Sequence, residues 1–259
     1  MKNDKNFVIT EQNADTYVQV IADWIGTKIR DANRKGIVLG MSGGVDCSVV
    51  AALCHVANVP IHLVMMPYGD DMENTDSLSH AMKLIEKFNF SYHTFDIKPV
   101  VDALTISSDD EFSKAISGTN LSLARENIRP RVRMTYLYQF AQLNSYFVSG
   151  TGNMSERTVG YFTKWGDGAC DINPLGFLTK GEVRIIAKSL GVPDSIINKP
   201  PSAGLKKGQT DEDDLGMTYS QIDDYILNGT SGSSEIDALI EHRILLSKHK
   251  SEEIPVFKG

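Results

Sequence analysis

Residues 37–57 read IVLGMSGGVDCSVVAALCHVA, and this stretch decides the fold. Its first five residues, 37–41, are mostly apolar and β-branched, which is typical of a short buried strand. Ser42, Gly43 and Gly44 come next, and a helical pattern then runs from Asp46 to about residue 57. A strand that passes through a glycine turn into a helix predicts the first half of a βαβ unit.

The same alternation of strand and helix patterns continues along the chain. Strand-like runs occupy residues 61–65, 92–97 and 146–149, and helical patterns occupy residues 78–88 and 131–143. This alternation predicts an α/β fold, with a doubly wound, mostly parallel sheet and helices on both faces. We expect a single domain that spans residues 1–259.

A capping box of Thr179 and Glu182 predicts the beginning of a further helix, which Gly191 and Pro193 end. Its apolar stripe consists of Val183, Ile186, Ala187 and Leu190. Two segments rich in Gly, Ser and acidic residues look irregular, and we expect them to be loops within the domain. They are residues 202–215 and 228–234.

Composition and charge limit the class of protein. The chain has 259 residues, 41% of them hydrophobic, and a formal net charge of −7, which argues against a broad nucleic-acid interface. Residues 1–12 lack the pattern of a signal peptide, and no apolar run approaches the length of a membrane span. Three cysteines without a C-x-x-C pair indicate reduced thiols. We therefore expect a cytoplasmic protein with neither a nucleic-acid nor a membrane partner.

Residues 40–47, GMSGGVDC, carry the strongest local signal. Glycines allow backbone N–H groups to approach an anion, and the following helix N-terminus favours negative charge. The stretch is therefore interpreted as a phosphate-binding loop, with an ordinary strand-to-helix turn as the alternative. Asp46 would repel a phosphate unless a cation lay between them, so it suggests Mg²⁺.

A second glycine turn, GTGNMSE at residues 150–156, follows the fourth predicted strand. Ligands of parallel sheets bind beyond the carboxyl ends of the strands, so both turns are expected to open onto one crevice. Glu156 could then supply a second ligand to Mg²⁺.

Basic residues form weaker signals. Arg129, Arg131 and Arg133 lie within one short segment, where they suit phosphate or carboxylate as well as they suit a solvated helix face. Lys164, together with Asp167 and Asp171 among glycines and an aromatic residue, suggests a binding loop. Basic residues such as Lys250 near the end of a helix commonly complement its dipole.

Taken together and in this order, these motifs resemble the NAD synthetase family of ATP pyrophosphatases. SGGVD at residues 42–46 resembles the pyrophosphate loop S-G-G-x-D-S of the whole group. The segments more specific to NAD synthetases are GTGN at 150–153 with Glu156, TKWGD at 163–167, DINP at 171–174, LTK at 178–180, KPPSAGL at 199–205, GQTDE at 208–212 and HK at 249–250. The resemblance covers residues 38–255.

The resemblance implies a role for each matching residue. ATP would be bound by Gly40, Met41, Ser42, Gly43, Gly44, Val45, Asp46, Cys47, Thr151, Lys180 and Ser202. Deamido-NAD would be bound by Arg131, Lys164, Asp171, His249 and Lys250. Asp46 and Glu156 would bind Mg²⁺, and Asp46, Glu156, Lys180 and Asp171 would form the catalytic set. The family also implies a homodimer.

The implied reaction is the ATP-dependent amidation of deamido-NAD with ammonia through an acyl-adenylate, which releases AMP and pyrophosphate. A chain of this length has no room for a glutaminase domain, so free ammonia is the expected nitrogen donor. A regulatory nucleotide-binding module would need neither Glu156 nor the cationic loops. GMP synthetase would carry further domains, and a tRNA thiolase would need a basic face.

Three residues depart from the family pattern. Cys47 replaces the usual Ser, Pro130 replaces Ala, and Ser251 stands where an arginine is common. Pro130 is compatible with the first turn of a helix. For Cys47 two interpretations stay open: a reactive thiol that faces the nucleotide, or a small packing group in the core. Residues 202–215 are expected to order over the site when ligands bind.

Overall fold

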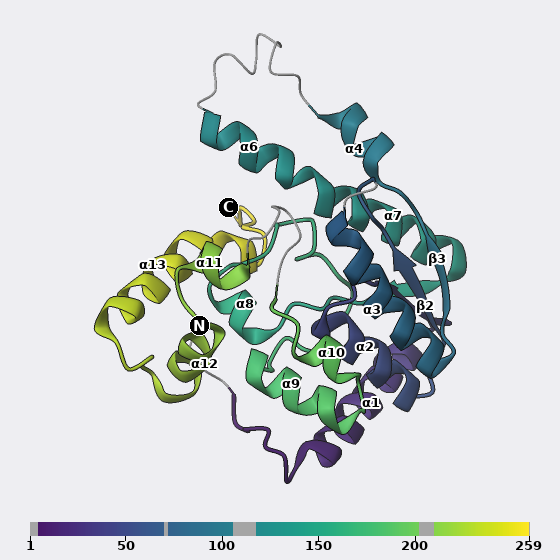
Figure 1. The fold of residues 1–259 in the computed structure, drawn as a ribbon, viewed down its shortest axis with the longest axis horizontal. Helices are drawn as coiled ribbons and strands as arrows, with labels where there is room; N and C mark the ends of the chain where they lie inside the picture. The colour runs from purple at the N-terminus through teal and green to yellow at the C-terminus, as the bar shows by residue number, and fades with distance from the viewer. Residues whose placement is uncertain (1–4, 70–71, 106–117, 202–209, 259) are drawn as a thin grey trace.

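The computed structural model describes residues 5–69, 72–105, 118–201 and 210–258 (Figure 1). Its sheet consists of four parallel strands in the order β3-β2-β1-β4. They are β1 (Gly36–Gly40), β2 (Ile61–Met65), β3 (Ser91–Thr94) and β4 (Tyr146–Val148). A single parallel bridge from Ser149 to Ile172 continues the sheet beyond β4. The predicted α/β fold with a parallel sheet is confirmed.

Helices cover both faces of the sheet and extend to one side of it. They are α1 (Ala14–Asp31), α2 (Val45–Val56), α3 (Met72–Phe88), α4 (Lys98–Leu104), α6 (Gly118–Glu126), α7 (Ile128–Asn144), α8 (Met154–Thr158), α9 (Lys180–Ser189), α10 (Asp194–Ile197), α11 (Asp211–Leu215), α12 (Tyr219–Asn228) and α13 (Ser234–Ser251). None of the helices described is long and apolar enough to cross a membrane.

Alternating strand residues separate two apolar cores. Leu39 and Leu63 face the larger core, which contains the buried residues of α1, α2 and α9. Val38 and Val64 face the smaller core, against α4 and α7. A third cluster joins α8 to α11, α12 and α13, which lie on the side of the molecule away from the sheet (Figure 1).

The strand-to-helix units agree with the sequence, apart from boundaries. The third strand ends at Thr94, although the sequence pattern suggested residue 97. The Phe95 N–H still bonds to Met65 O at the end of β2, but the Ile97 N–H bonds to Pro67 O, beyond that strand. The helix predicted from Thr179 begins at Lys180, and both hydrogen bonds of its capping box are present.

The expectation of an irregular segment at residues 202–215 was wrong for its last part. Asp211–Leu215 is the short helix α11, because Thr210 accepts a hydrogen bond from Asp213 N and Asp213 accepts one from Thr210 N. Residues 202–209 lie outside the described residues. The expectation that this segment orders over the site when ligands bind therefore also falls outside them. The other predicted loop, residues 228–234, connects α12 to α13.

Gly36 provides a test of the packing at the beginning of the sheet. A Cβ at this position would lie 2.4 Å from Pro60 O and 2.9 Å from the Tyr146 ring, so Gly36→Ala forces the strands apart. We expect the free energy of unfolding in urea to fall by about 1–3 kcal/mol. Gly26→Ala in α1 is the control, because only the movable end of Arg30 lies near and alanine favours a helix. Equal changes in both variants would contradict this account.

Candidate active site

The centre of the candidate site is the ammonium group of Lys180, held between two carboxylates. Lys180 Nζ lies 2.6 Å from Asp46 Oδ2 and 3.3 Å from Glu156 Oε1. The Lys180 side chain is only 2% exposed, and the two acids are also largely buried. The three residues come from the first turns of α2, α8 and α9. The structure therefore brings together three of the four residues predicted as catalytic.

Electrostatics at this cluster are dominated by burial. Burial raises the pKa of Glu156, and the carboxylates of Asp46 and Asp211 raise it further, against the attraction of Lys180. Burial alone would lower the pKa of Lys180, but the attraction of Asp46 and Glu156 outweighs it and leaves this pKa above its usual value. The cluster thus favours bound cations, since each one stabilises the ionised carboxylates.

Asn153 fixes the position of both acids, and the sequence analysis did not identify it as a site residue. Its side-chain amide donates to Asp46 Oδ1 over 2.9 Å. Its side-chain oxygen accepts from Glu156 N, and its backbone N–H donates to Glu156 Oε2. The signal that could have revealed it is the capping pair formed by Asn153 and Glu156 three residues later.

The first turn of α9 is fixed by side chains from other helices. Lys180 N donates to Ser155 Oγ over 3.0 Å, and Gly181 N donates to Asp223 Oδ2 over 2.8 Å. Ser155 Oγ in turn donates to Asp223 Oδ1, which connects α8 with α12. Asp223 was not identified from the sequence either. These bonds satisfy helix N–H groups that would otherwise lack acceptors, so they hold the backbone that carries Lys180.

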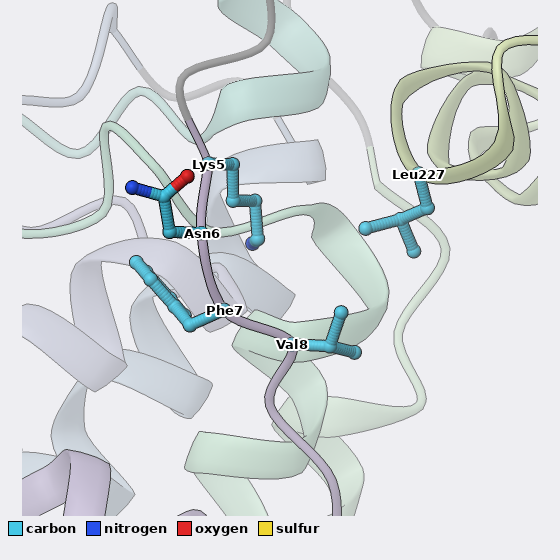
Figure 2. Close-up of a pocket in the computed structure, with 5 residues that line it drawn as sticks. All are labelled: Lys5, Asn6, Phe7, Val8 and Leu227. Atoms are coloured by element: carbon cyan, nitrogen blue, oxygen red, sulfur yellow. The ribbon is translucent and has the colours of Figure 1, made fainter.

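Residues 5–9 support the same helix end through Glu182. Ile9 N donates to Glu182 Oε1 over 2.9 Å, and the Lys5 ammonium forms an ion pair with Glu182 Oε2. Figure 2 shows this segment beside Leu227 of α12, across a hollow of about 320 Å³. Of the residues that line the hollow, only Lys5 is titratable, and its ammonium is occupied by Glu182. The segment therefore acts as a support of α9.

A buried tyrosine closes the cluster on the side of α12. Tyr219 OH donates to Asp211 Oδ2 over 3.0 Å, and the Lys180 ammonium lies 4.9 Å from the centre of the Tyr219 ring. Burial and the nearby carboxylates raise the pKa of Tyr219, so its hydroxyl stays protonated as a donor. Tyr219 therefore supports the charge of Lys180 through its ring, while its hydroxyl group bonds to Asp211.

The predicted phosphate loop runs from β1 into α2. Gly43 has a φ of 76°, and a Cβ there would lie 2.1 Å from Ser77 O, so this position requires glycine. Within the described part of the chain, the backbone N–H groups of Val45, Asp46 and Cys47 have no acceptor. Unpaired N–H groups at a helix N-terminus provide a binding site for an anion.

Cys47 is buried within this loop. Its sulfur lies 3.2 Å from Gly44 O, 3.3 Å from Ser42 Oγ and 3.5 Å from Met41 Sδ. Of the two interpretations of its side chain, a packing group in the core agrees with this position better than a thiol that faces the nucleotide.

A second group of predicted residues gathers around residues 160–165. Arg131 Nε donates to Lys164 O over 3.4 Å, and Lys164 Nζ donates to His249 O over 2.5 Å. Lys250 Nζ donates to Gly160 O and to Phe162 O, at 2.8 Å each. Four predicted binding residues, Arg131, Lys164, His249 and Lys250, therefore lie together, although they are far apart in the sequence.

The remaining predicted residues lie apart from these contacts. Asp171 accepts from Val148 N over 2.8 Å and from Tyr138 OH over 3.4 Å, at the edge of β4. No contact joins it to Lys180 in the described residues. Thr151 lies in the turn after β4, and Ser202 lies outside the described residues.

Comparison with known proteins identifies the family of the chain. The profile of the NAD synthase family matches residues 17–254. The chain belongs to this family. It is 40% identical to the NH(3)-dependent NAD(+) synthetase of Carboxydothermus hydrogenoformans over 247 residues. This alignment covers 94% of this chain and 98% of that enzyme. It is 34% identical to the enzyme of the same name from Mycoplasma pneumoniae, over 95% of this chain and 96% of that one.

Solved structures of NAD synthetases have the same fold. The NH3-dependent NAD synthetase of Campylobacter jejuni superposes with a TM-score of 0.74 at 28% identity, over 97% of this chain and all of that one. An NMN synthetase from Francisella tularensis superposes with a TM-score of 0.87 at 33% identity, again over 97% of this chain and all of that one. The resemblance inferred from the motifs is thus confirmed at the level of the family.

A substitution of Lys180 tests the central cluster. Lys180→Met leaves two carboxylates buried without their cation, so we expect the free energy of unfolding at pH 7 to fall by about 3–5 kcal/mol. Adding Glu156→Gln removes one of those charges and should restore part of the loss. The control is Lys98→Met, which breaks an exposed pair with Asp102 and should change little. A Lys180 variant as stable as the native protein would refute the charge balance described here.

Proposed function

We propose that Asp46, Glu156 and Lys180 form the catalytic centre for the ATP-dependent amidation of deamido-NAD with ammonia. This reaction makes the protein a ligase that forms a carbon–nitrogen bond. The observation that supports the assignment best is the convergence of two carboxylates and a buried ammonium beside unpaired N–H groups of the phosphate loop. We place the reaction in the cytoplasm, because all three cysteines are free.

The first step activates the carboxylate. An oxygen of the nicotinate carboxylate attacks the α-phosphorus of ATP, the bond to the bridging oxygen breaks, and pyrophosphate leaves. Lys180 and the loop N–H groups stabilise the negative charge that develops on this leaving group. Asn153 holds Asp46 and Glu156 so that they cannot turn away from the reacting phosphates.

The second step forms the amide. The nitrogen of ammonia attacks the acyl carbon of the adenylate, AMP leaves, and the nitrogen loses a proton to solvent or to a nearby base. Arg131, Lys164, His249 and Lys250 are proposed to hold the nicotinate nucleotide, with Asp171 at the edge of its site. Thr151 and Ser202 are proposed to contact ATP, as is the loop of residues 40–47.

Mg²⁺ is proposed to bind at Asp46 and Glu156. Two carboxylates, together with oxygens of the ATP phosphates, are the usual ligands of this ion. Their oxygens already share one cation, the Lys180 ammonium, and this supports the proposal that the pair accepts positive charge. The ion would neutralise phosphate charge when it is bound.

A second candidate substrate is favoured by the Francisella tularensis structure. The TM-score of 0.87 for that NMN synthetase exceeds the 0.74 for the Campylobacter jejuni NAD synthetase, with equal coverage. An enzyme of that name forms nicotinamide mononucleotide, so the corresponding acid is nicotinate mononucleotide. Its carboxylate needs the same activation by ATP, and it differs from deamido-NAD only by the missing AMP portion.

One assay tests the function and separates the two substrates. The protein is incubated with MgATP, ammonium and either deamido-NAD or nicotinate mononucleotide, and amide product, AMP and ADP are quantified by chromatography. We expect one AMP for each amide formed and a higher kcat/KM for deamido-NAD. A higher kcat/KM for the mononucleotide would establish the second candidate.

Asp46→Ala and Glu156→Ala are the negative variants of this assay, and each should lower kcat at least a hundredfold because metal and phosphate lose a ligand. Formation of ADP in place of AMP would exclude the adenylate. Full turnover by both variants would exclude the proposed metal site.

We propose further that the protein is a homodimer. Helix α6 and helix α7, which also carries Arg131, have the exposed apolar side chains Leu123, Tyr138 and Leu143. Leu143 is 79% exposed. Such side chains are typical of a surface that a second copy covers. Light scattering at the concentration of the assay should give twice the mass of 28.6 kDa. A monomer that is fully active would contradict the proposal.

A further inference from the structure

Arg133 is a largely buried cation to which the mechanism above gives no role. It lies in α7, and its Nε donates to Met66 O over 3.0 Å. Met66 directly follows β2, so the guanidinium group is anchored at the carboxyl end of that strand. This bond uses one N–H of the guanidinium group, and four N–H groups remain on its two terminal nitrogens.

The position of Arg133 relative to β1 follows from the packing of α7. A Cβ on Gly40, the last residue of β1, would lie 3.4 Å from Leu137 and 3.3 Å from Met66. Arg133 precedes Leu137 by four residues, so it lies on the same face of α7, one turn of about 6 Å nearer the helix N-terminus. Because α7 leads directly into β4, its N-terminus lies at the carboxyl edge of the sheet. Arg133 is therefore placed just beyond the end of β1, where the phosphate loop begins.

The charge of Arg133 is not balanced by an ion pair. Among the described residues, no carboxylate lies within salt-bridge distance of its guanidinium group. Burial, with repulsion from Arg129, lowers the pKa of Arg133 to about 10, against a weaker attraction from Asp167. An arginine in such surroundings still carries its charge at neutral pH, so an anion that enters beside it gains a strong partner.

Two anions have to meet near this position. Arg133 lies just beyond β1, where the phosphate loop begins, and only two residues along α7 from Arg131, which bonds to Lys164 and is proposed to hold the nicotinate nucleotide. The carboxylate of that nucleotide and the α-phosphate of ATP repel each other as they approach. A fixed cation beside them lowers this repulsion, and a planar guanidinium group suits the two oxygens of either anion.

We infer that Arg133 binds an oxyanion of the reacting pair, either the nicotinate carboxylate or the α-phosphate of ATP. The inference rests on the proposed function and adds to it a binding residue beside the beginning of the phosphate loop. A purely structural role, in which Arg133 only ties α7 to Met66, is the competing explanation.

Binding measurements separate these explanations. Arg133→Gln and native protein are titrated by calorimetry with MgATP, with deamido-NAD and with NAD. NAD has the phosphates of deamido-NAD but an amide in place of its carboxylate, so the ratio of the two affinities isolates the carboxylate. The control is Arg30→Gln, whose guanidinium group lies on α1 and bonds to Thr27.

If Arg133 binds the carboxylate, Arg133→Gln should lose at least tenfold in affinity for deamido-NAD relative to NAD. If it binds the α-phosphate, the loss of at least tenfold should appear with MgATP. Unchanged affinities for all three ligands, in a variant with a native unfolding midpoint, would overturn the inference. Arg133→Lys keeps the charge without the planar fork, and should show a severalfold loss for the same ligand.

If Arg133→Gln does not fold, Arg133→Lys tests the inference in its place. Native affinities for all three ligands in a folded Arg133→Lys would likewise overturn the inference. Failure of the proposed function gives a different result: native protein would form neither amide nor AMP in the assay. The MgATP titration would still judge the phosphate role of Arg133 in that case, because it requires no turnover.

Discussion

The ion pairing of Lys180 with Asp46 and Glu156 is the constraint on which the rest of the structure depends. Each of these residues lies in the first turn of a different helix, so three helix ends must meet within a few ångströms. The parallel sheet makes this possible, because β1 and β4 are neighbours and the loops after them open at the same edge. A buried ammonium group without such carboxylate partners would be unfavourable in this core.

The cluster is held by more bonds than its three members form with one another. Asn153 contacts both acids, Ser155 and Asp223 fix the backbone of α9, and Glu182 joins that helix to residues 5–9. Removal of one contact therefore leaves others that resist movement of the charged groups. Such a preorganised arrangement is what stabilisation of a developing phosphate charge requires, because the groups need not reorient during the reaction.

The sequence predicted the parts of the site that depend on local patterns. The glycine loop around Asp46 follows an apolar strand, and the capping box before Lys180 is complete within four residues, so both can be recognised without tertiary information. Asp223 could not be recognised, because an acid on a helix has no local signal and its partner, Ser155, is 68 positions away. The loop interpretation of α11 failed since acidic residues were taken as a sign of irregular structure, whereas Thr210 caps them.

Both ends of the described chain form contacts with residues of the candidate site region. Residues 5–9 bind to Glu182, 173 positions later, while Lys250 reaches back 90 positions to Gly160. During synthesis on the ribosome the first of these contacts must wait for α9, and the second must wait for α13. The contacts around α9 and those around residues 160–162 therefore form at different stages of synthesis, and the second set forms only after α13 has emerged and packed.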